Sequence, residues 1–440
     1  MKRTGVVVVG AGITGLALAH ELARRGVEHV VLEAEDRPGG VIRSVRVEGK
    51  VLEIGPQRTR RVPPVDRLVE QLDLEGELLE ASDDLPLYVY ADGDLRRVPM
   101  SVGQLVRTDL LSLRGKLRMA LEPLSRGIRP GETVADFVIR KLGREAHDRL
   151  VGPLYGGIYG SDTRDMLVEH SLGRALTRIG AADRSLAVTG LRWILKGAET
   201  PAACSFRDGM ETLPRALYRA HADRILLGEP VGDASLSERG REWRVAAQSG
   251  SWLADDVVLT VPSREAARLT RQAFPGLAGR LDRFAYNPIV TVHLEGDCGL
   301  RGMGYQIALG EDFASRGATW NESLFGRDGV HTAYLGGAGR EDLWEAPDDE
   351  LARIARREFE RVTGCVTRPL NVARVRMPAW DRTWRVHDEI ELPTGLHLCA
   401  AYVSRAGIPG RLEAARGLAE ALAHRSVDAG SGLGTGVGPG

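Results

Sequence analysis

The chain has 440 residues, of which 43% are hydrophobic and 27% charged, as in a globular enzyme with room for two or more cores. Its 59 basic and 60 acidic residues give a net charge of −1, so the basic excess typical of nucleic-acid binding is absent and no nucleic-acid partner is expected. This composition also excludes a disordered or fibrous chain.

Cysteines and hydrophobic runs bear on the location of the protein. The four cysteines are far apart, and their spacing indicates neither a zinc site, a redox pair nor a disulfide framework, so a cytoplasmic location is expected. No run reaches the about 18 apolar residues of a membrane-spanning helix. The nearest, residues 185–196, is interrupted by Gly190 and Arg192. Any membrane contact is therefore expected to be peripheral, on the cytoplasmic face.

The first predicted unit is a strand, a glycine turn and a helix. Residues 6–9 are valines, typical of a strand buried on both faces, and they lead through a glycine turn into an amphipathic helix over 16–25. Gly10 permits the tight turn, Gly12 lets the backbone approach a pyrophosphate, and Gly15 lets the helix pack closely on the strand. The pattern predicts a dinucleotide at the N-terminus of this helix.

A second predicted strand, residues 29–32, ends at Glu33, at the spacing where a carboxylate accepts hydrogen bonds from an adenosine ribose. Gly39 and Gly40 follow, and they resemble the second FAD motif of the amine-oxidase-like flavoproteins, which NAD dehydrogenases do not need. FAD is therefore the expected cofactor, with a glycine-rich turn that binds no ligand as the alternative. No second Gly-x-Gly-x-x-Gly follows a predicted strand, so oxygen or another diffusible compound is the expected electron acceptor.

The remaining chain predicts an α/β fold in which an FAD-binding Rossmann-like domain is interleaved with an α+β substrate domain. In chain order, the FAD-binding parts are residues 1–84, 201–265 and 386–425, and the substrate parts are a helical, membrane-proximal segment at 85–200 and a sheet-based segment at 266–385. Residues 426–440 are rich in Gly and Ser and are expected to be disordered. The cleft between the domains is the expected ligand site.

The motifs together resemble the protoporphyrinogen and coproporphyrinogen oxidase family of monoamine-oxidase-like flavoproteins, from about residue 3 to residue 422. The matching segments, in the family's order, are residues 40–46, 53–56, 154–162, 205–214, 258–262, 335–337 and 407–409. The resemblance implies oxygen-linked dehydrogenation of coproporphyrinogen III or protoporphyrinogen IX to the porphyrin, in heme biosynthesis. Repeated hydride transfer to the flavin N5 would perform it, without a catalytic side chain or a metal.

The resemblance also implies which residues hold the cofactor. The pyrophosphate would lie at residues 10–15, the ribose at Glu33, the adenine beside Val231 and the pyrimidine end of the flavin at residues 407–409. The full implied set is Gly10, Gly12, Ile13, Thr14, Gly15, Glu33, Ala34, Gly40, Val41, Ile42, Arg43, Gly55, Pro56, Gln57, Val231, Gly407, Ile408 and Pro409.

The residues implied for the substrate each have a second interpretation. Gly156, Gly157 and Tyr159 would line an apolar slot for the macrocycle, or would form a glycine-rich helix junction. Arg58 and Arg60 would bind substrate carboxylates, or would belong to a solvated arginine cluster.

The sequence departs from the family at several places. Leu-Pro-Leu at 85–87 stands where an arginine binds a propionate, and residues 384–387 replace Ile-Pro-Gln-Tyr. The C-terminal flavin segment changes at 398–400, 409–411 and 414–415. Two alternatives follow: a related flavin amine oxidase or desaturase with another substrate, or an inactive homologue that binds porphyrin or flavin. A homodimer is left open.

Overall fold

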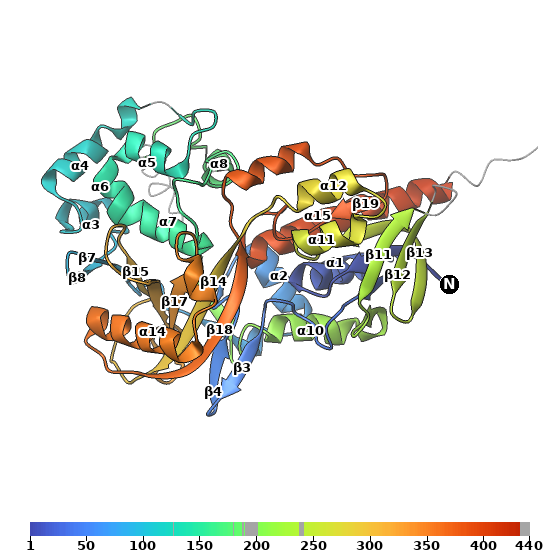
Figure 1. Ribbon diagram of the computed structural model, residues 1–440, viewed down its shortest axis with the longest axis horizontal. Helices are drawn as coiled ribbons and strands as arrows, with labels where there is room; N and C mark the ends of the chain where they lie inside the picture. Colours follow the sequence, from blue (N-terminus) through green and yellow to red (C-terminus); the bar gives the residue numbers. More distant parts are fainter. Residues whose placement is uncertain (126, 179, 187–188, 190–200, 237–241, 432–440) are drawn as a thin grey trace, which may run out of the picture.

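The computed structural model describes the whole chain except residues 126, 179, 187–188, 190–200, 237–241 and 432–440 (Figure 1). The described residues form two large sheets of seven strands each, a group of helices beyond the second sheet, and two small sheets. The small sheets are β3 (Ser44–Val47) with β4 (Lys50–Glu53), and β5 (Thr59–Arg60) with β9 (Ala203–Phe206) and β6 (Leu78–Glu80).

The first sheet is the predicted Rossmann-like sheet. Its order is β10 (Ile225–Leu226), β2 (His29–Leu32), β1 (Lys2–Val9), β13 (Gly250–Leu259), β12 (Trp243–Ala247) and β11 (Val231–Leu236), with β19 (Leu396–Leu398) also on β13. Strands β10, β2, β1, β13 and β19 are parallel, while β11 and β12 continue the sheet as an antiparallel ribbon. Three separate parts of the chain therefore build one sheet.

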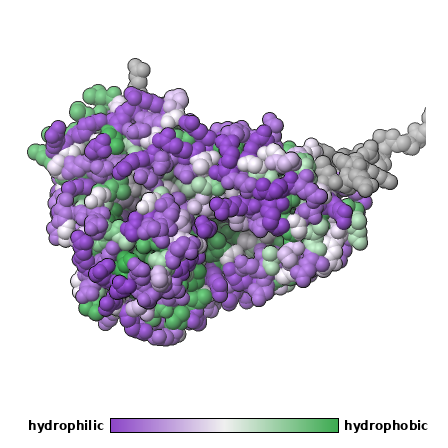
Figure 2. All heavy atoms as spheres, in the orientation of Figure 1, coloured by the Kyte–Doolittle hydropathy of each residue, from purple (hydrophilic) through white to green (hydrophobic). Residues whose placement is uncertain are grey.

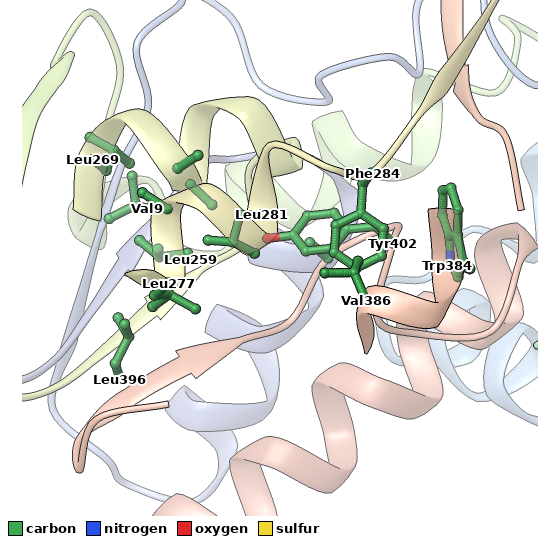
Figure 3. Close-up of a cluster of buried hydrophobic side chains, with 14 of the residues drawn as sticks. Val9, Leu259, Leu269, Leu277, Leu281, Phe284, Trp384, Val386, Leu396 and Tyr402 are labelled. Carbon is green, nitrogen blue, oxygen red and sulfur yellow. The ribbon is translucent and has the colours of Figure 1, made fainter. Parts of the chain in front are cut away.

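The alternating side chains of β1 explain how this sheet is covered. Val6 and Val8 face a core shared with α1 (Ile13–Arg24), α10 (Thr212–Ala220) and α15 (Gly407–Ser431). Val7 and Val9 face the opposite core, where α11 (Ser263–Thr270) and α12 (Pro275–Leu281) supply Leu269, Leu277 and Leu281 (Figure 3). Because both faces of the sheet are buried, this strand contains consecutive valines rather than alternating apolar and polar residues.

The second sheet belongs to the substrate domain. Its order is β18 (Arg368–Pro378), β14 (Tyr286–Glu295), β17 (Val330–Gly336), β16 (Ser315–Trp320), β15 (Gly304–Ile307), β7 (Leu87–Ala91) and β8 (Asp94–Arg97). Strands β7 and β8 form a hairpin that pairs through β7 with β15, so the two inserted parts of the chain share one sheet. The chain returns to this sheet at Tyr286, later than the expected boundary at residue 266, because α11 and α12 pack on the first sheet.

Helices complete the substrate domain. They are α3 (Val102–Arg107), α4 (Leu113–Ala120), α5 (Val134–Leu142), α6 (Arg144–Ala146), α7 (Gly152–Tyr159), α8 (Leu172–Arg178), α13 (Asn321–Phe325) and α14 (Asp348–Thr363), while α2 (Pro63–Gln71) packs near α15. Among the described residues, no helix is both long and apolar enough to span a bilayer. The apolar stretch at 185–196 lies mostly outside the described residues.

Two expectations from the sequence are wrong. Cys298 and Cys365 form a disulfide, with Cα atoms 5.6 Å apart, because β14 and β18 pair and bring together loops that are 67 residues apart in sequence. Residues 426–431, expected to be disordered, continue helix α15, while residues 432–440 lie outside the described part.

Candidate functional site

The turn after β1 shows why glycines stand there. A Cβ added at Gly15 would lie 2.0 Å from the carbonyl oxygen of Gly10, so a larger residue would displace the backbone. A Cβ at Gly12 would meet no heavy atom within 4 Å, so Gly12 borders open space at the N-terminus of α1. No described side chain caps this helix, whose first turn buries Ile13 and Thr14. Its first N–H groups are therefore available to a pyrophosphate.

Glu33 follows β2 and is held by backbone hydrogen bonds. Its Oε2 accepts one of 2.5 Å from the N–H of Ala11, and its Oε1 accepts one of 2.9 Å from the N–H of Glu35. Each carboxylate oxygen can accept a further hydrogen bond, so the acid can also bind ribose hydroxyls. The carboxylate is thereby fixed beside the glycine turn.

A cavity of about 660 Å³ opens next to Glu33. Gly10, Ala34 and Val231, which the sequence assigned to the cofactor, line it together with Glu33. This volume lies within the range of small-molecule sites, about 300–1,000 Å³. The adenosine half of a dinucleotide fits this position, because the cavity lies at the carboxyl ends of parallel strands β1 and β2.

Sequence reasoning missed Arg268 of α11, which also lines this cavity. Its guanidinium donates to the carbonyl oxygens of Val231 and Gly232 at 2.8 and 2.9 Å, and Glu265 accepts from its Nε at 2.7 Å. The arginine therefore fixes the wall beside Val231. The matching segment at 258–262 lies just before α11, but it gave no signal for an arginine on the helix that follows.

The second glycine pair lies against the first glycine turn. The N–H of Gly39 donates to the carbonyl oxygen of Ala11 at 2.8 Å, and a Cβ at Gly40 would lie 3.3 Å from the Cα of Gly12. The two glycine segments, about thirty residues apart in sequence, therefore lie side by side, and their backbones form one continuous surface.

The segment after this pair combines one buried and two exposed side chains. Ile42 is buried, whereas Arg43 is exposed and the apolar Val41 is 60% exposed. A Cβ at Gly55 would lie 1.9 Å from the carbonyl oxygen of Val41, which places Gly55 and Pro56 beside the same segment. A flavin bound beside this segment would cover the exposed Val41 side chain.

Gln57 uses its side chain within the protein. Its Nε2 donates to the carbonyl oxygen of Glu53 at 2.8 Å, and its Oε1 accepts from Asn321 and Thr332, each at 3.0 Å. Because Asn321 and Thr332 belong to the substrate domain, Gln57 joins the two domains. A contact between Gln57 and the cofactor would have to use its backbone.

The two candidate arginines differ in environment. Arg60 is exposed, and its guanidinium donates to the carbonyl oxygen of Pro201 at 2.8 Å. Arg58 is partly buried, and burial lowers the pKa of its guanidinium. It makes no hydrogen bond or ion pair with any described residue, and the hydroxyl of Tyr334 on β17 acts on it electrostatically. Among the described residues, Arg58 is thus a cation without a partner.

The first turn of α15 adjoins the other cofactor segments. Gly407 has a φ of +81°, Pro409 follows in the first turn, and Ile408 is buried in the same core as Ile13 and Ile42. The predicted C-terminal segment therefore meets the two N-terminal glycine motifs.

The predicted slot residues lie at the end of α7. A Cβ at Gly157 would lie 2.3 Å from Oε1 of Gln306, and one at Gly156 would lie 2.8 Å from the carbonyl oxygen of Ser161, so both glycines permit close packing. Tyr159 lies 6.1 Å from Trp380 between ring centroids.

The divergent segment at 384–387 belongs to a buried core. Trp384 stacks on Trp380 at 5.2 Å and also contacts Phe284 (Figure 3).

In the parts of the chain that are described, no group of three or more His, Cys, Asp or Glu side chains is placed to hold a metal ion.

Comparison with known proteins gives a family match over most of the chain. The family described as flavin containing amine oxidoreductase matches residues 13–417. Protoporphyrinogen oxidase 1 from the chloroplast of Spinacia oleracea is 28% identical over 400 residues, covering 81% of this chain and 70% of the relative. Protoporphyrinogen oxidase of Bos taurus is 29% identical over 356 residues, covering 74% of each.

Solved structures share the fold. A protein of Exiguobacterium sp. 255-15, provisionally described as a protoporphyrinogen oxidase, has a TM-score of 0.77 and 23% identity, covering 96% of this chain and 99% of that one. Putrescine oxidase bound to putrescine has a TM-score of 0.72 and 17% identity, covering 96% and 99%.

The residues of this chain fit FAD. The open face of Gly12 and the uncapped α1 suit the pyrophosphate, and the cavity beside Glu33 suits the adenosine. Val41 follows Gly40, which approaches Gly12, and the first turn of α15 shares a buried core with Ile13 and Ile42, so the flavin ring would lie beside these segments. When bound, FAD supplies a hydride acceptor; the surrounding residues bind it, orient it and hold its substrate.

Proposed function

This chain belongs to the flavin-containing amine oxidoreductase family and uses FAD, and from that premise we propose that it dehydrogenates a porphyrinogen to a porphyrin in heme biosynthesis. Oxygen is the proposed electron acceptor, and coproporphyrinogen III and protoporphyrinogen IX are the candidate substrates. The names of the relatives that match three quarters or more of the chain support this choice.

The observation that carries the proposal is Arg58. A partly buried guanidinium is costly without a counter-ion, so a bound anion would compensate for it. Porphyrinogens carry propionates, and an arginine fork matches a carboxylate geometrically. Residues 85–87 lack the arginine of the family, and Arg58 would take over its role from the loop after Pro56.

Arg58 also separates the proposal from its main alternative. An amine oxidase binds a cationic substrate, and an unpaired cation near the substrate would repel it. Anionic macrocycles are attracted by the same charge. The aromatic pair Tyr159 and Trp380 offers an apolar surface to such a ring system.

Anaerobic mixing tests the proposal. The FAD-loaded protein would be mixed in parallel with coproporphyrinogen III, protoporphyrinogen IX and putrescine, and bleaching of the flavin would be followed. Reduction by a porphyrinogen alone is expected, and the faster of the two identifies the substrate. Reduction by putrescine alone would favour an amine oxidase, and tight porphyrin binding without any reduction would favour an inactive homologue.

A variant pair tests the role of Arg58. Arg58→Gln is expected to raise KM for the porphyrinogen about 10- to 100-fold, the cost of one charge-assisted contact. Arg60→Gln, at the exposed neighbour, is expected to change KM far less. Equal effects of the two variants would contradict a specific carboxylate contact at Arg58.

We also propose that the protein binds anionic membranes peripherally, on the cytoplasmic face. An apolar patch on α3, α4 and the adjoining turns consists of Met100, Val102, Val106, Leu113, Leu117, Leu121 and Leu124, each at least 54% exposed. Figure 2 shows hydrophobic residues at the end of the molecule where Figure 1 draws α4. Arg97, Arg107 and Arg114 are exposed and lack ion-pair partners among the described residues. Apolar and basic groups together suit anionic lipid.

Vesicle sedimentation tests this contact. The protein is expected to bind phosphatidylglycerol vesicles more tightly than phosphatidylcholine vesicles. The double variant Leu113→Asp and Leu117→Asp is expected to lose binding, whereas Val366→Asp, at an exposed valine outside the apolar patch, keeps it. Equal binding of all three proteins, or no binding, would contradict the proposal.

A further inference from the structure

Arg411 is a buried cation in α15. It is 9% exposed, and although burial lowers its pKa to about 10, it is protonated at neutral pH. Its Nη1 donates to the carbonyl oxygens of Ser404 and Arg405 at 3.2 and 3.0 Å and to the Ser404 hydroxyl. Its Nε and Nη2 have no hydrogen-bond partner among the described residues. Two of the three guanidinium nitrogens are therefore available to a ligand.

No carboxylate of the described residues neutralises this cation. The groups whose charges act on it are Cys399, Tyr286 and Tyr159, all of them neutral near pH 7. Burial raises the pKa of Cys399 to about 12, which keeps that thiol protonated. A buried charge without a counter-ion is destabilising, so the arrangement points to an anionic or electron-rich ligand beside Arg411.

The position of Arg411 indicates which ligand this is. Cys399 directly follows β19, so it lies at the carboxyl edge of the first sheet, where the dinucleotide binds. Tyr159 belongs to α7 of the substrate domain, and the charge of Arg411 acts on its hydroxyl. The pyrimidine end of the flavin is placed at residues 407–409, and residue 411 follows within about one helical turn.

We propose that Arg411 is the electrostatic partner of the flavin pyrimidine ring. With FAD bound, hydride transfer would break a substrate C–H bond, form the N5–H bond and leave a negative charge on the pyrimidine side of the flavin. The free side of the Arg411 guanidinium would stabilise that charge without a proton transfer to the ring. The inference rests on the flavin placement proposed above and not on the identity of the substrate.

Sulfite binding tests the cation without any substrate. Sulfite donates an electron pair from sulfur to the flavin N5 and leaves the same negative charge on the ring, so its affinity reports stabilisation of that charge. Arg411→Gln removes the charge and keeps a donor for the Ser404 carbonyl. Arg411→Lys keeps the charge. Arg405→Gln is the matched control, because Arg405 is exposed, pairs with Glu413 and also acts on Tyr159.

Arg411→Gln is expected to weaken sulfite binding about 10- to 100-fold, as for the loss of one preorganised charge-assisted contact. At pH 7 or below, Arg411→Lys and Arg405→Gln are expected to remain within about threefold of the original protein. An Arg411→Gln protein that holds FAD and binds sulfite as tightly as the original would overturn the proposal. A porphyrinogen that fails to reduce the flavin would contradict the proposed substrate and leave this result unaffected.

A pH profile decides the matter if Arg411→Gln does not retain FAD. Lysine has a lower intrinsic pKa than arginine, and burial lowers it further, so the Arg411→Lys protein should lose sulfite affinity between about pH 7 and 9. Arg411 titrates near pH 10, so the original protein should keep its affinity over that range. If sulfite affinity depended on pH in the same way in both proteins, Arg411 would only hold the loop at Ser404 and Arg405 against α15, and the proposal would be overturned.

Discussion

The carboxylate of Glu33 accepts a hydrogen bond of 2.5 Å from the backbone N–H of Ala11, across the carboxyl ends of β2 and β1. This bond joins the acid proposed to bind the ribose to the turn proposed to bind the pyrophosphate. Both proposed contacts therefore depend on one side chain, which also lines the cavity beside Val231.

Replacement of Glu33 by glutamine is expected to weaken FAD binding about 10- to 100-fold, because the amide offers one acceptor oxygen where the carboxylate offers two charged ones. The affinity can be measured by adding FAD to the apoprotein and following flavin fluorescence. Glu35→Gln is the control, since Glu35 is exposed in the same loop and its carboxylate forms an ion pair with Arg37. Equal affinities of the two variants would contradict the role of Glu33.

Two alanine substitutions in the glycine turn are expected to act differently. Gly15→Ala would place a methyl group 2.0 Å from the carbonyl oxygen of Gly10, so the apoprotein itself should melt at a lower temperature. Gly12→Ala meets no protein atom within 4 Å, so the apoprotein should melt normally and only FAD affinity should fall. Melting curves with and without FAD measure both effects. A Gly12→Ala apoprotein as unstable as Gly15→Ala would contradict this distinction.

The pyrophosphate end of the site was predictable because its signals are local. The glycine spacing, the buried valine strand and Glu33 fall within about thirty residues, and each has a separate physical reason. The structure joins Gly10, Glu33 and Val231 in one cavity and places Gly40 against Gly12. The Rossmann-like sheet and its interruption by a second domain were also predicted.

The remaining features depend on contacts between distant segments. Nothing near Cys298 indicates Cys365, and the pairing of β14 with β18 alone brings them together. Arg268 contacts Val231 only because α11 lies over β11. In the sequence, Arg411 is only one of the residues that depart from the family pattern. Its burial, and the lack of a carboxylate partner among the described residues, follow from the packing of α15 and could not be predicted.

Reduction of the Cys298–Cys365 disulfide is expected to lower the free energy of unfolding by about 4 kcal/mol, because a long loop loses its closure. Unfolding of the original protein with and without a reductant, compared with Cys298→Ser/Cys365→Ser, measures this. The double variant should match the reduced protein and should not respond to the reductant. A thiol titration of the protein from the cell would show whether the pair is reduced there, as the predicted cytoplasmic location requires.

Glu53 is expected to make stability fall as the pH rises. Burial raises the pKa of Glu53 from 4.5 to about 7, while Ser44 and the N–H of Met210 donate to its carboxylate at 2.6 and 2.9 Å. Between these pH values the folded protein holds a proton that the unfolded chain releases. The contribution of Glu53 is therefore largest below pH 4.5 and is lost as the pH rises to about 7.

Glu53→Gln mimics the protonated acid at every pH, because its amide can donate to Ser44 and accept from Met210. Relative to the original protein, the variant should gain stability from pH 5 to pH 8, up to about 3 kcal/mol for the full shift. Denaturant unfolding at several pH values measures the gain. Glu48→Gln is the control. Glu48 is exposed in the turn between β3 and β4, and Arg368 lowers the pKa of its carboxyl, so this variant should show no such gain. A constant difference between Glu53→Gln and the original protein would mean that Glu53 is ionised in the fold, with Arg327 as its counter-ion at 3.5 Å.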